Sequence, residues 1–217
     1  MDILSYKLGQ KSSGGGGGSS RDWSEIGYEE EPPFIDRGVN YAKTIKNNWD
    51  ATQTSLQRKF NNDNDIIFMP MVNTSNVTNM KYTFQNCANL KCVPSLDTQN
   101  VTSMIAMFNN CTSLEDAPIF NTSNVNDMGS MFEGCKDLKN VPIYDTSKTK
   151  YMSNTFAYNS SLSETSLDNI LQMCINAITS TKTLSYIGFN STNQTVETIQ
   201  ALPHYQDFLN AGWTIGY

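Results

Sequence analysis

Few residues of this chain have the types and spacing that catalysis or metal binding requires. His204 is the only histidine, and it lies near the C-terminus where we expect a structural or surface role. The carboxylates at 29–31 and at 115–116 are typical of solvated charge. The five glycines at 14–18 lack the preceding strand pattern and the following Lys-Ser/Thr pair of a phosphate-binding loop. Because no G-x-S-x-G or H-E-x-x-H sequence occurs either, we expect no enzyme activity, no cofactor and no metal site.

One set of sulfur-bearing and aromatic residues recurs with a period of 24 residues. Its members are Met80, Met104, Met128 and Met152, Phe84, Phe108, Phe132 and Phe156, and Cys87, Cys111 and Cys135 with Asn159 in the fourth slot. Sulfur ligands suit a soft metal ion, but at this spacing core packing is the far commoner role. The prolines and leucines that keep the same period are Pro70, Pro94, Pro118 and Pro142, and Leu90, Leu114, Leu138 and Leu162. A fixed period of this length predicts stacked coils, a solenoid, because one repeat cannot bury its apolar face alone.

The residues within one repeat predict its local structure. Val77, Met80, Phe84 and Cys87 are spaced as one stripe of an α-helix of about three turns. The apolar run 90–93 predicts one strand, which ends at a proline because proline cannot donate to a ladder. The polar run 73–76 predicts a turn whose short oxygen-bearing side chains bond nearby backbone and cap the next helix. We therefore expect an α/β solenoid with a narrow parallel sheet, about 20 Å long over four coils.

The repeat pattern P-x-x-[ND]-T-[SQ]-[NK]-[VT]-x-x-M-x-x-x-F over residues 65–162 resembles the BspA-like leucine-rich repeats of bacterial surface proteins and of phages that infect gut bacteria. This resemblance implies the solenoid architecture and a tendency to bind other molecules, and it implies no reaction. The fourth copy departs from the pattern at Thr149 and Asn159, as expected where a stack is about to be capped.

The rest of the chain divides around the repeats. Residues 1–20 form a short apolar head followed by a Gly/Ser linker. Residues 21–64 form an extended acidic segment and a helix predicted over Asp36–Phe60, which either caps the first coil or self-associates, with the cap favoured. Residues 163–217 form an α/β C-terminal cap, with a helix after the start signal at 165–168 and a strand over 183–189.

Composition excludes several classes of partner. The net charge of −6 and a pI near 4.7 argue against nucleic acid. No apolar run reaches the roughly 18 residues that a membrane span requires, so we expect no membrane insertion. The N-terminus does not have the pattern of a secretory signal. An odd number of cysteines without C-x-x-C spacing favours reduced, unpaired thiols.

The opening residues 2–9, followed by the Gly/Ser linker, resemble virion accessory (head fiber) proteins of Bacteroides-infecting, crAss-like phages. The resemblance implies a non-enzymatic capsid-surface fiber that belongs to the virion and binds capsid or other virion proteins through its N-terminus. The residues expected to dock there are Ile3, Leu4, Tyr6, Lys7 and Leu8. The alternatives are a BspA-like adhesin or protein-binding module of the bacterial cell surface, and a carbohydrate- or receptor-binding tip.

Two surfaces of the body are expected to make contacts. A spike-like display protein is expected to be a homo-oligomer, with a homodimer favoured over a trimer. The residues expected at that contact are Trp23, Tyr28, Ile45, Trp49 and Leu56. Slots that vary between repeats and are expected to be exposed form the candidate surface for a glycan or host ligand: Lys81, Tyr82, Ile105, Ala106, Gly129, Ser130, Ser153 and Asn154.

Overall fold

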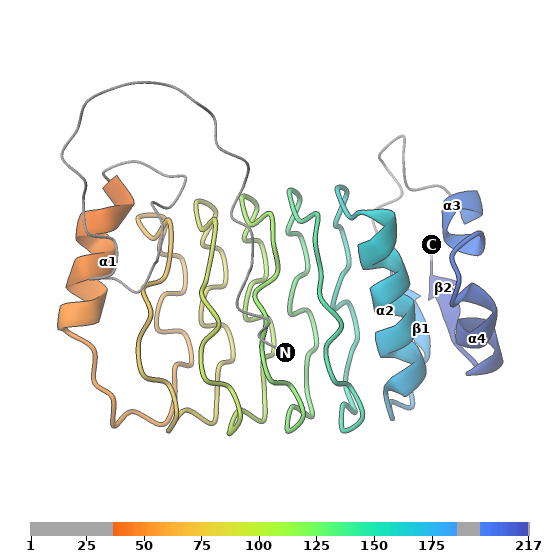
Figure 1. Cartoon of the computed structure of the whole chain (residues 1–217), viewed down its shortest axis with the longest axis horizontal. Helices are drawn as coiled ribbons and strands as arrows, with labels where there is room; N and C mark the ends of the chain where they lie inside the picture. The colour runs from red at the N-terminus through yellow and green to blue at the C-terminus, as the bar shows by residue number, and fades with distance from the viewer. Residues whose placement is uncertain (1–36, 186–195, 217) are drawn as a thin grey trace, which may run out of the picture.

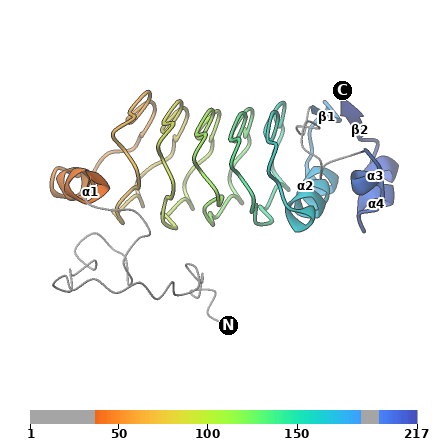
Figure 2. The same cartoon turned by 90° about the horizontal axis from the view of Figure 1, so that it is seen from above.

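The computed structural model describes residues 37–185 and 196–216. The helices and strands in chain order are α1 (Arg37–Asn47), α2 (Glu164–Asn176), β1 (Thr183–Ser185), α3 (Val196–Gln200), α4 (Tyr205–Asn210) and β2 (Thr214–Gly216). Between α1 and α2 the chain winds in successive coils that lie side by side, with helices at both ends of the row (Figure 1). Seen from above, α1 closes one end of this row, and near the other end α2 lies at one edge of the row while β1 and β2 lie at the opposite edge (Figure 2).

Backbone hydrogen bonds join each coil to the next at a constant sequence offset. The N–H groups of Leu56, Met80, Met104 and Met128 each donate to the carbonyl 23 residues further on, at 2.8 to 3.0 Å. In each coil, the N–H groups two, four and six residues later make the same bond to the next coil. The residues between them bond within their own coil, as Thr83 N–H does to the Met80 carbonyl at 3.4 Å. We call the five stacked segments that share this pattern the turn ladder; they are residues 55–62, 79–86, 103–110, 127–134 and 151–158.

The predicted helix within each repeat is wrong. Residues 81–86 form consecutive turns, and both Tyr82 and Asn86 have a positive φ, 58° and 61°. A left-handed residue reverses the direction of the following peptide, so alternate N–H groups point to the neighbouring coil and not along a helix axis. The burial that the stripe predicted is nevertheless confirmed, since Val77, Met80 and their equivalents in the next two coils are fully buried.

In place of the strand predicted for each repeat, the structure has isolated bridges between neighbouring coils. Phe68 pairs with Cys92, and Asp116 with Asn140, both in parallel orientation and without a continuous ladder. Within the described residues the only sheet is the two-stranded parallel pair β1–β2, in which Leu184 is opposite Ile215. The stacking of coils is therefore carried mainly by turns, and the α/β solenoid classification stays a prediction.

The predicted polar turns form as expected. The Asn73 Oδ1 atom accepts from the Ser75 N–H at 3.0 Å, and Asp97 does the same for Gln99 at 3.2 Å. The threonine that follows each of them is buried and reaches the next coil: the Thr74 hydroxyl donates to the Asp97 carbonyl at 2.8 Å. These residues close turns and link coils, because short oxygen-bearing side chains replace missing backbone partners.

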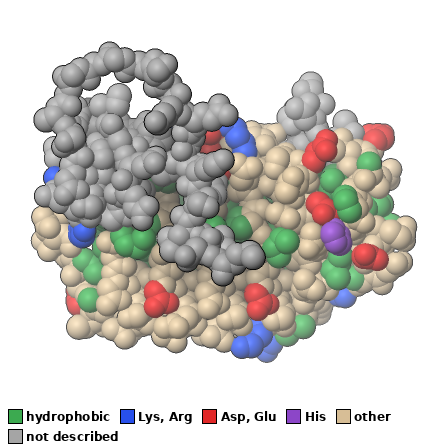
Figure 3. Space-filling view, in the orientation of Figure 1, with side chains coloured by type: hydrophobic (Ala, Val, Ile, Leu, Met, Phe, Trp, Pro, Cys, Tyr) green, Lys and Arg blue, Asp and Glu red, His purple; other side chains and the backbone are tan. Residues whose placement is uncertain are grey.

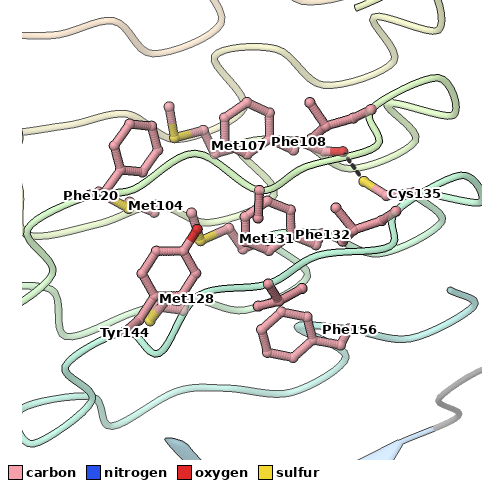
Figure 4. Close-up of a cluster of buried hydrophobic side chains, with 14 of the residues drawn as sticks. Met104, Met107, Phe108, Phe120, Met128, Met131, Phe132, Cys135, Tyr144 and Phe156 are labelled. Carbon is pink, nitrogen blue, oxygen red and sulfur yellow. Dashed lines mark hydrogen bonds between the residues drawn. The ribbon is translucent and has the colours of Figure 1, made fainter. Parts of the chain in front are cut away.

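A column of aromatic rings runs through the core. Phe60, Phe84, Phe108, Phe132 and Phe156 stack with centroid separations of 5.3 to 5.7 Å and interplanar angles of 6° to 10°. Methionines from the same coils pack beside them, and the Cys135 thiol donates to the Phe108 carbonyl at 3.0 Å (Figure 4). Each coil thus adds one layer to a continuous apolar column.

The first coil begins earlier in the sequence than the repeat pattern indicates. The predicted helix Asp36–Phe60 ends at Asn47, and the residues after it enter the turn ladder. Leu56, Phe60 and Ile66 occupy the slots of Met80, Phe84 and Leu90, and all three are buried. A helix through this segment would leave the carbonyls of the second coil without donors, which explains why tertiary pairing overrides the helical periodicity.

Helix α2, the first helix after the coils, docks against the end of the stack. Ser163 caps α2 by accepting from the Ser166 N–H. The Ser166 hydroxyl donates to the Lys139 carbonyl and accepts from the Val141 N–H, both at 2.9 Å. The strand predicted over 183–189 is present as β1 for its first three residues, and residues 186–189 lie outside the described part of the chain.

The aromatic column provides a test of the coil register. Phe108 is fully buried between Phe84 and Phe132, so Phe108→Ala should lower the free energy of unfolding by about 3–5 kcal/mol through the cavity it creates. Ile143→Ala removes an exposed side chain and should cost below about 1 kcal/mol. Chemical denaturation of both variants measures the difference. Equal losses for the two variants would contradict the stacking.

Candidate binding surface

The candidate ligand residues lie on the outward side of the turn ladder. Tyr82, Ala106, Ser130 and Asn154 occupy one slot of four successive coils, and all have positive φ. Their backbone is fixed by the ladder, since the Tyr82, Ala106 and Ser130 N–H groups donate to the next coil at 2.8 to 2.9 Å. A slot whose backbone is held by the stack can change its side chain from coil to coil without disturbing the core.

Of the eight residues predicted to be exposed on this surface, two are exposed, five are half-buried and one is buried. Ser153 and Asn154 are exposed, while Lys81, Tyr82, Ile105, Gly129 and Ser130 are half-buried. Ala106 is only 4% exposed, so its prediction as a contact residue is wrong, because its small side chain lies below its neighbours. Tyr82 holds the Arg58 guanidinium over its ring at 5.1 Å, which orients both side chains on the first two coils.

Two exposed aromatic residues on the last coil were missed by the sequence reasoning. Tyr151 is 61% exposed and Tyr158 is 56% exposed, and both lie in the turn ladder. The equivalent slots in the preceding coils hold serine, asparagine, aspartate or glycine, namely Ser55, Asn79, Ser103 and Asp127 for the first and Asn62, Asn86, Asn110 and Gly134 for the second. An aromatic residue in a column of small polar residues was the available signal.

Amide side chains form a ladder of their own beside this surface. The Asn86 Nδ2 atom donates to Asn62 Oδ1 at 2.8 Å, and Asn110 Nδ2 donates to Asn86 Oδ1 at 3.0 Å. The ladder stops at Gly134, where a Cβ atom would lie 2.4 Å from the Asn110 Oδ1 atom. Asparagine and glycine suit this column because both tolerate the left-handed conformation.

The residues that directly follow the repeat prolines form a separate, apolar surface on the side of the stack where α2 lies. Met71, Ile119 and Ile143 are exposed in the same slot of three coils. A hollow of about 230 Å³ lies between the last coils and α2, lined by residues including Ile119, Val141 and Asn169. Where Figure 3 shows described residues on this face, the hydrophobic side chains are dispersed among charged side chains of both signs.

The residues predicted for oligomerisation divide into two groups. Ile45 of α1 and Leu56 of the first coil are both buried in the core of the chain itself, so neither offers an exposed contact. Trp49 is half-buried, and its Nε1 atom donates to the Asn73 carbonyl at 2.8 Å. Trp23 and Tyr28 lie outside the described residues, as do the predicted docking residues Ile3, Leu4, Tyr6, Lys7 and Leu8.

His204 has the structural role that we expected. Its backbone N–H and its Nδ1 atom both bond the Asp168 carboxylate, at 3.0 and 2.8 Å. This pair joins the start of α4 to α2 within the C-terminal region. Across residues 37–185 and 196–216, His, Cys, Asp and Glu side chains form no group of three that could hold a metal ion. In the same part of the chain no helix is both long and apolar enough to span a bilayer.

The repeated cysteines are thiols within the core. Cys87, Cys111 and Cys135 are free and buried, and each donates to a phenylalanine carbonyl of the preceding coil at 2.9 to 3.0 Å. Burial raises the pKa of Cys87 and that of Cys135 to about 12, and it raises the pKa of Cys111 and Cys174 as well. These thiols are therefore protonated at neutral pH and unsuited to nucleophilic chemistry.

The coils match a known protein family. Residues 54–170, more than half of the chain, match the family described as "Mycoplasma protein of unknown function, DUF285", which is related to BspA-like repeat proteins. The match starts at the first coil and ends within α2, so it covers the turn ladder and its core. No curated protein and no solved structure is significantly similar to this chain.

The core thiols give a chemical test of this geometry. In native Cys92→Ser protein at pH 8, the four remaining cysteines should react with a disulfide reagent far more slowly than in guanidinium. Because the folded-state pKa values are raised, the stabilisation from the neutral thiols is complete below pH about 8.5 and is lost as the pH rises toward 12. Denaturation between pH 7 and 11 should show this decline. Rapid native labelling would place the cysteines outside the core.

Proposed function

The chain belongs to the DUF285 family, and on this premise we propose that it is a non-enzymatic display protein of a phage virion, a capsid-surface fiber. Its stacked coils present an outward surface for adhesion or for contact with a host or glycan ligand. Its N-terminal head anchors this body to capsid or other virion proteins.

The observation that carries the proposal is the division between a constant core and variable outward slots. The buried columns repeat almost without change, and backbone bonds at a constant offset fix the frame. The outward slot at Tyr82 holds an alanine, a serine and an asparagine in the next three coils. A rigid frame that tolerates side-chain variation on one face is suited to recognition, because such a site loses little conformational entropy on binding.

The groups that could do chemistry have structural roles instead. His204 is held by Asp168, and the core thiols bond backbone carbonyls and stay protonated. The buried thiols support binding over catalysis, because a nucleophile needs an accessible reacting atom and a lowered pKa.

The anchor is supported by the sequence of the first twenty residues. Ile3, Leu4, Tyr6 and Leu8 precede a linker of serine and glycine, which separates them from the body. Each buried apolar side chain contributes about 1.5–3 kcal/mol to docking, so one arm binds modestly. Several arms of one oligomer bind far more tightly through effective concentration, which is why we include a homo-oligomer, a dimer before a trimer, in the proposal.

A second candidate is a BspA-like adhesin or protein-binding module on a bacterial surface. The description of the matching family names Mycoplasma, a bacterium, and this favours the second candidate. The two differ in what holds the coils in place, a virion or a bacterial envelope.

Deletion of residues 1–20 tests the proposal. The truncated chain should keep the thermal stability of the full chain, since the described core begins after residue 36, and it should no longer co-purify with phage particles. A full-length control with residues 3–8 in scrambled order keeps the composition and should also be lost from particles. The virion role would be refuted if the truncated chain still bound virions at full occupancy, or if the full-length chain were displayed on bacteria in the absence of phage.

A further inference from the structure

Three cationic side chains lie together on the first two coils of the stack. Arg58 and Lys59 are adjacent in the first coil, and the Arg58 N–H donates to the Lys81 carbonyl at 3.0 Å, so Lys81 lies beside Arg58 on the second coil. Arg58 and Lys59 are exposed, and Lys81 is half-buried. We call Arg58, Lys59 and Lys81 the cationic patch. Because the whole chain has a net charge of −6, this gathering of positive charge is local.

The coils that follow carry no positive charge. Between Lys91 and Lys136 the sequence contains no lysine or arginine, and it contains five carboxylates: Asp97, Glu115, Asp116, Asp127 and Glu133. The stacking does not require a cation in these slots either. The slot of Arg58 holds tyrosine, alanine, serine and asparagine in the other coils, and the slot of Lys81 holds glutamine, isoleucine, glycine and serine. The frame of the stack therefore does not account for the cationic patch.

No carboxylate forms an ion pair with the cationic patch within residues 37–185 and 196–216. The charge of Asp50 interacts with Lys59, but the Asp50 carboxylate accepts its hydrogen bonds from the Thr52 N–H and hydroxyl, at 2.9 and 2.6 Å. The positive charges of the patch are therefore not cancelled by acidic side chains in this part of the chain.

Aromatic rings and an amide hold the patch in place. The Arg58 guanidinium lies over the Tyr82 ring at 5.1 Å, and the Lys59 ammonium lies over the Trp49 ring at 5.6 Å. A ring orients a cation without cancelling its charge. The Gln57 amide, in the same slot as Lys81 one coil earlier, accepts from the Asn79 side chain at 3.1 Å. Oriented cations on a rigid frame lose little conformational entropy when they bind an anion.

The outward slots beyond the cationic patch are uncharged. Ile105, Gly129 and Ser153 follow Lys81 in its slot, and Ser130 and Asn154 continue the slot of Tyr82. Ser153 and Asn154 are exposed, and Ser130 is half-buried. A ligand that lies along these slots therefore meets cations at one end and hydroxyl and amide groups further on.

An acidic oligosaccharide combines both kinds of group that this surface can bind. Its anionic groups form charge-assisted hydrogen bonds with guanidinium and ammonium groups, and its hydroxyls exchange hydrogen bonds with hydroxyls and amides. A nucleic acid, with a phosphate at every unit, would be repelled by the carboxylates of the following coils. We propose that the cationic patch binds the anionic unit of an acidic oligosaccharide. This inference rests on the proposed display function and names the ligand class of its outward surface.

The test uses the purified full-length chain and titration calorimetry with two acidic probes, trigalacturonate and sialyllactose. Their matched neutral probes are the methyl ester of trigalacturonate and lactose, which lack the negative charge. At least one acidic probe should bind about tenfold more tightly than its neutral match, because the neutral match forms no charge-assisted hydrogen bond. Its affinity should also fall as the salt concentration is raised.

Substitutions within the patch locate the site. Arg58→Gln and Lys81→Gln should each weaken the binding about tenfold, the usual order for loss of one charge-assisted hydrogen bond. Lys150→Gln is the matched control, because it removes one positive charge from an exposed side chain at the last coil, and it should leave the affinity unchanged. All three variants should unfold at the wild-type temperature, since substitutions on the surface change stability little.

The proposal is overturned if neither acidic probe binds at millimolar concentration, if the neutral probes bind as tightly, if Arg58→Gln and Lys81→Gln bind as the wild type does, or if Lys150→Gln loses as much affinity as they do. Hexaglutamate tests the competing partner. If it binds as tightly as the acidic sugars, the cationic patch suits an acidic protein segment, and this result also overturns the proposal.

This outcome is separable from the virion assignment. The full-length control with residues 3–8 in scrambled order should keep its affinity for the acidic probe, and Arg58→Gln should still co-purify with phage particles. Loss of particle association with retained affinity counts against the anchor alone. Loss of affinity in the scrambled chain would count against the cationic patch, because residues 3–8 have no part in it.

Discussion

The fold depends on one repeated backbone contact, the bond from an N–H group to the carbonyl 23 residues further on. Buried peptide groups must be paired, and within the turn ladder the N–H groups find their partners on the adjacent coil or within the same turn. Every other regularity follows from that offset. A residue and its equivalent 24 positions later are forced into register, which brings like side chains together in columns of phenylalanine, methionine, threonine and asparagine.

These columns separate the apolar positions from the polar positions within the cross-section of each coil. Apolar columns meet in the middle, where the rings stack, and the Cys thiols and the Thr hydroxyls of the polar turns donate to carbonyls of a neighbouring coil. The threonine of each polar turn is buried, whereas the asparagine or aspartate before it is exposed. Side-chain variation between coils is therefore easiest in the outward slots, since any change in the inner columns is felt by two neighbouring coils.

Period, burial and turn chemistry were predictable from the sequence, and backbone conformation was not. Val77, Met80 and Phe84 follow a helical spacing, yet the same spacing places them on one side of a series of turns. Asn86, Asn110 and Gly134 signalled left-handed residues, but Tyr82 and Ala106 adopt that conformation without any such signal. For the site, variation between repeats predicted exposed positions at Ser153 and Asn154 but not at Ala106, which is buried. The exposure of Tyr151 and Tyr158 was signalled only by an aromatic residue in each of two columns of small polar residues.

The constant offset also gives the stack a direction. In the turn ladder, alternate carbonyls point toward the N-terminal end and alternate N–H groups toward the C-terminal end, whereas outside it the N–H groups of Thr78, Lys91 and Lys139 point toward the N-terminal end. Both faces of a coil therefore carry donors and acceptors, and each coil is a template on which a further coil can pair. At the ends of the row a helix stands in the place of that further coil, α1 at one end and α2 at the other (Figure 1). The peptide groups of a helix interior bond within the helix, so these two helices end the backbone pairing and protect the stack from growing end to end.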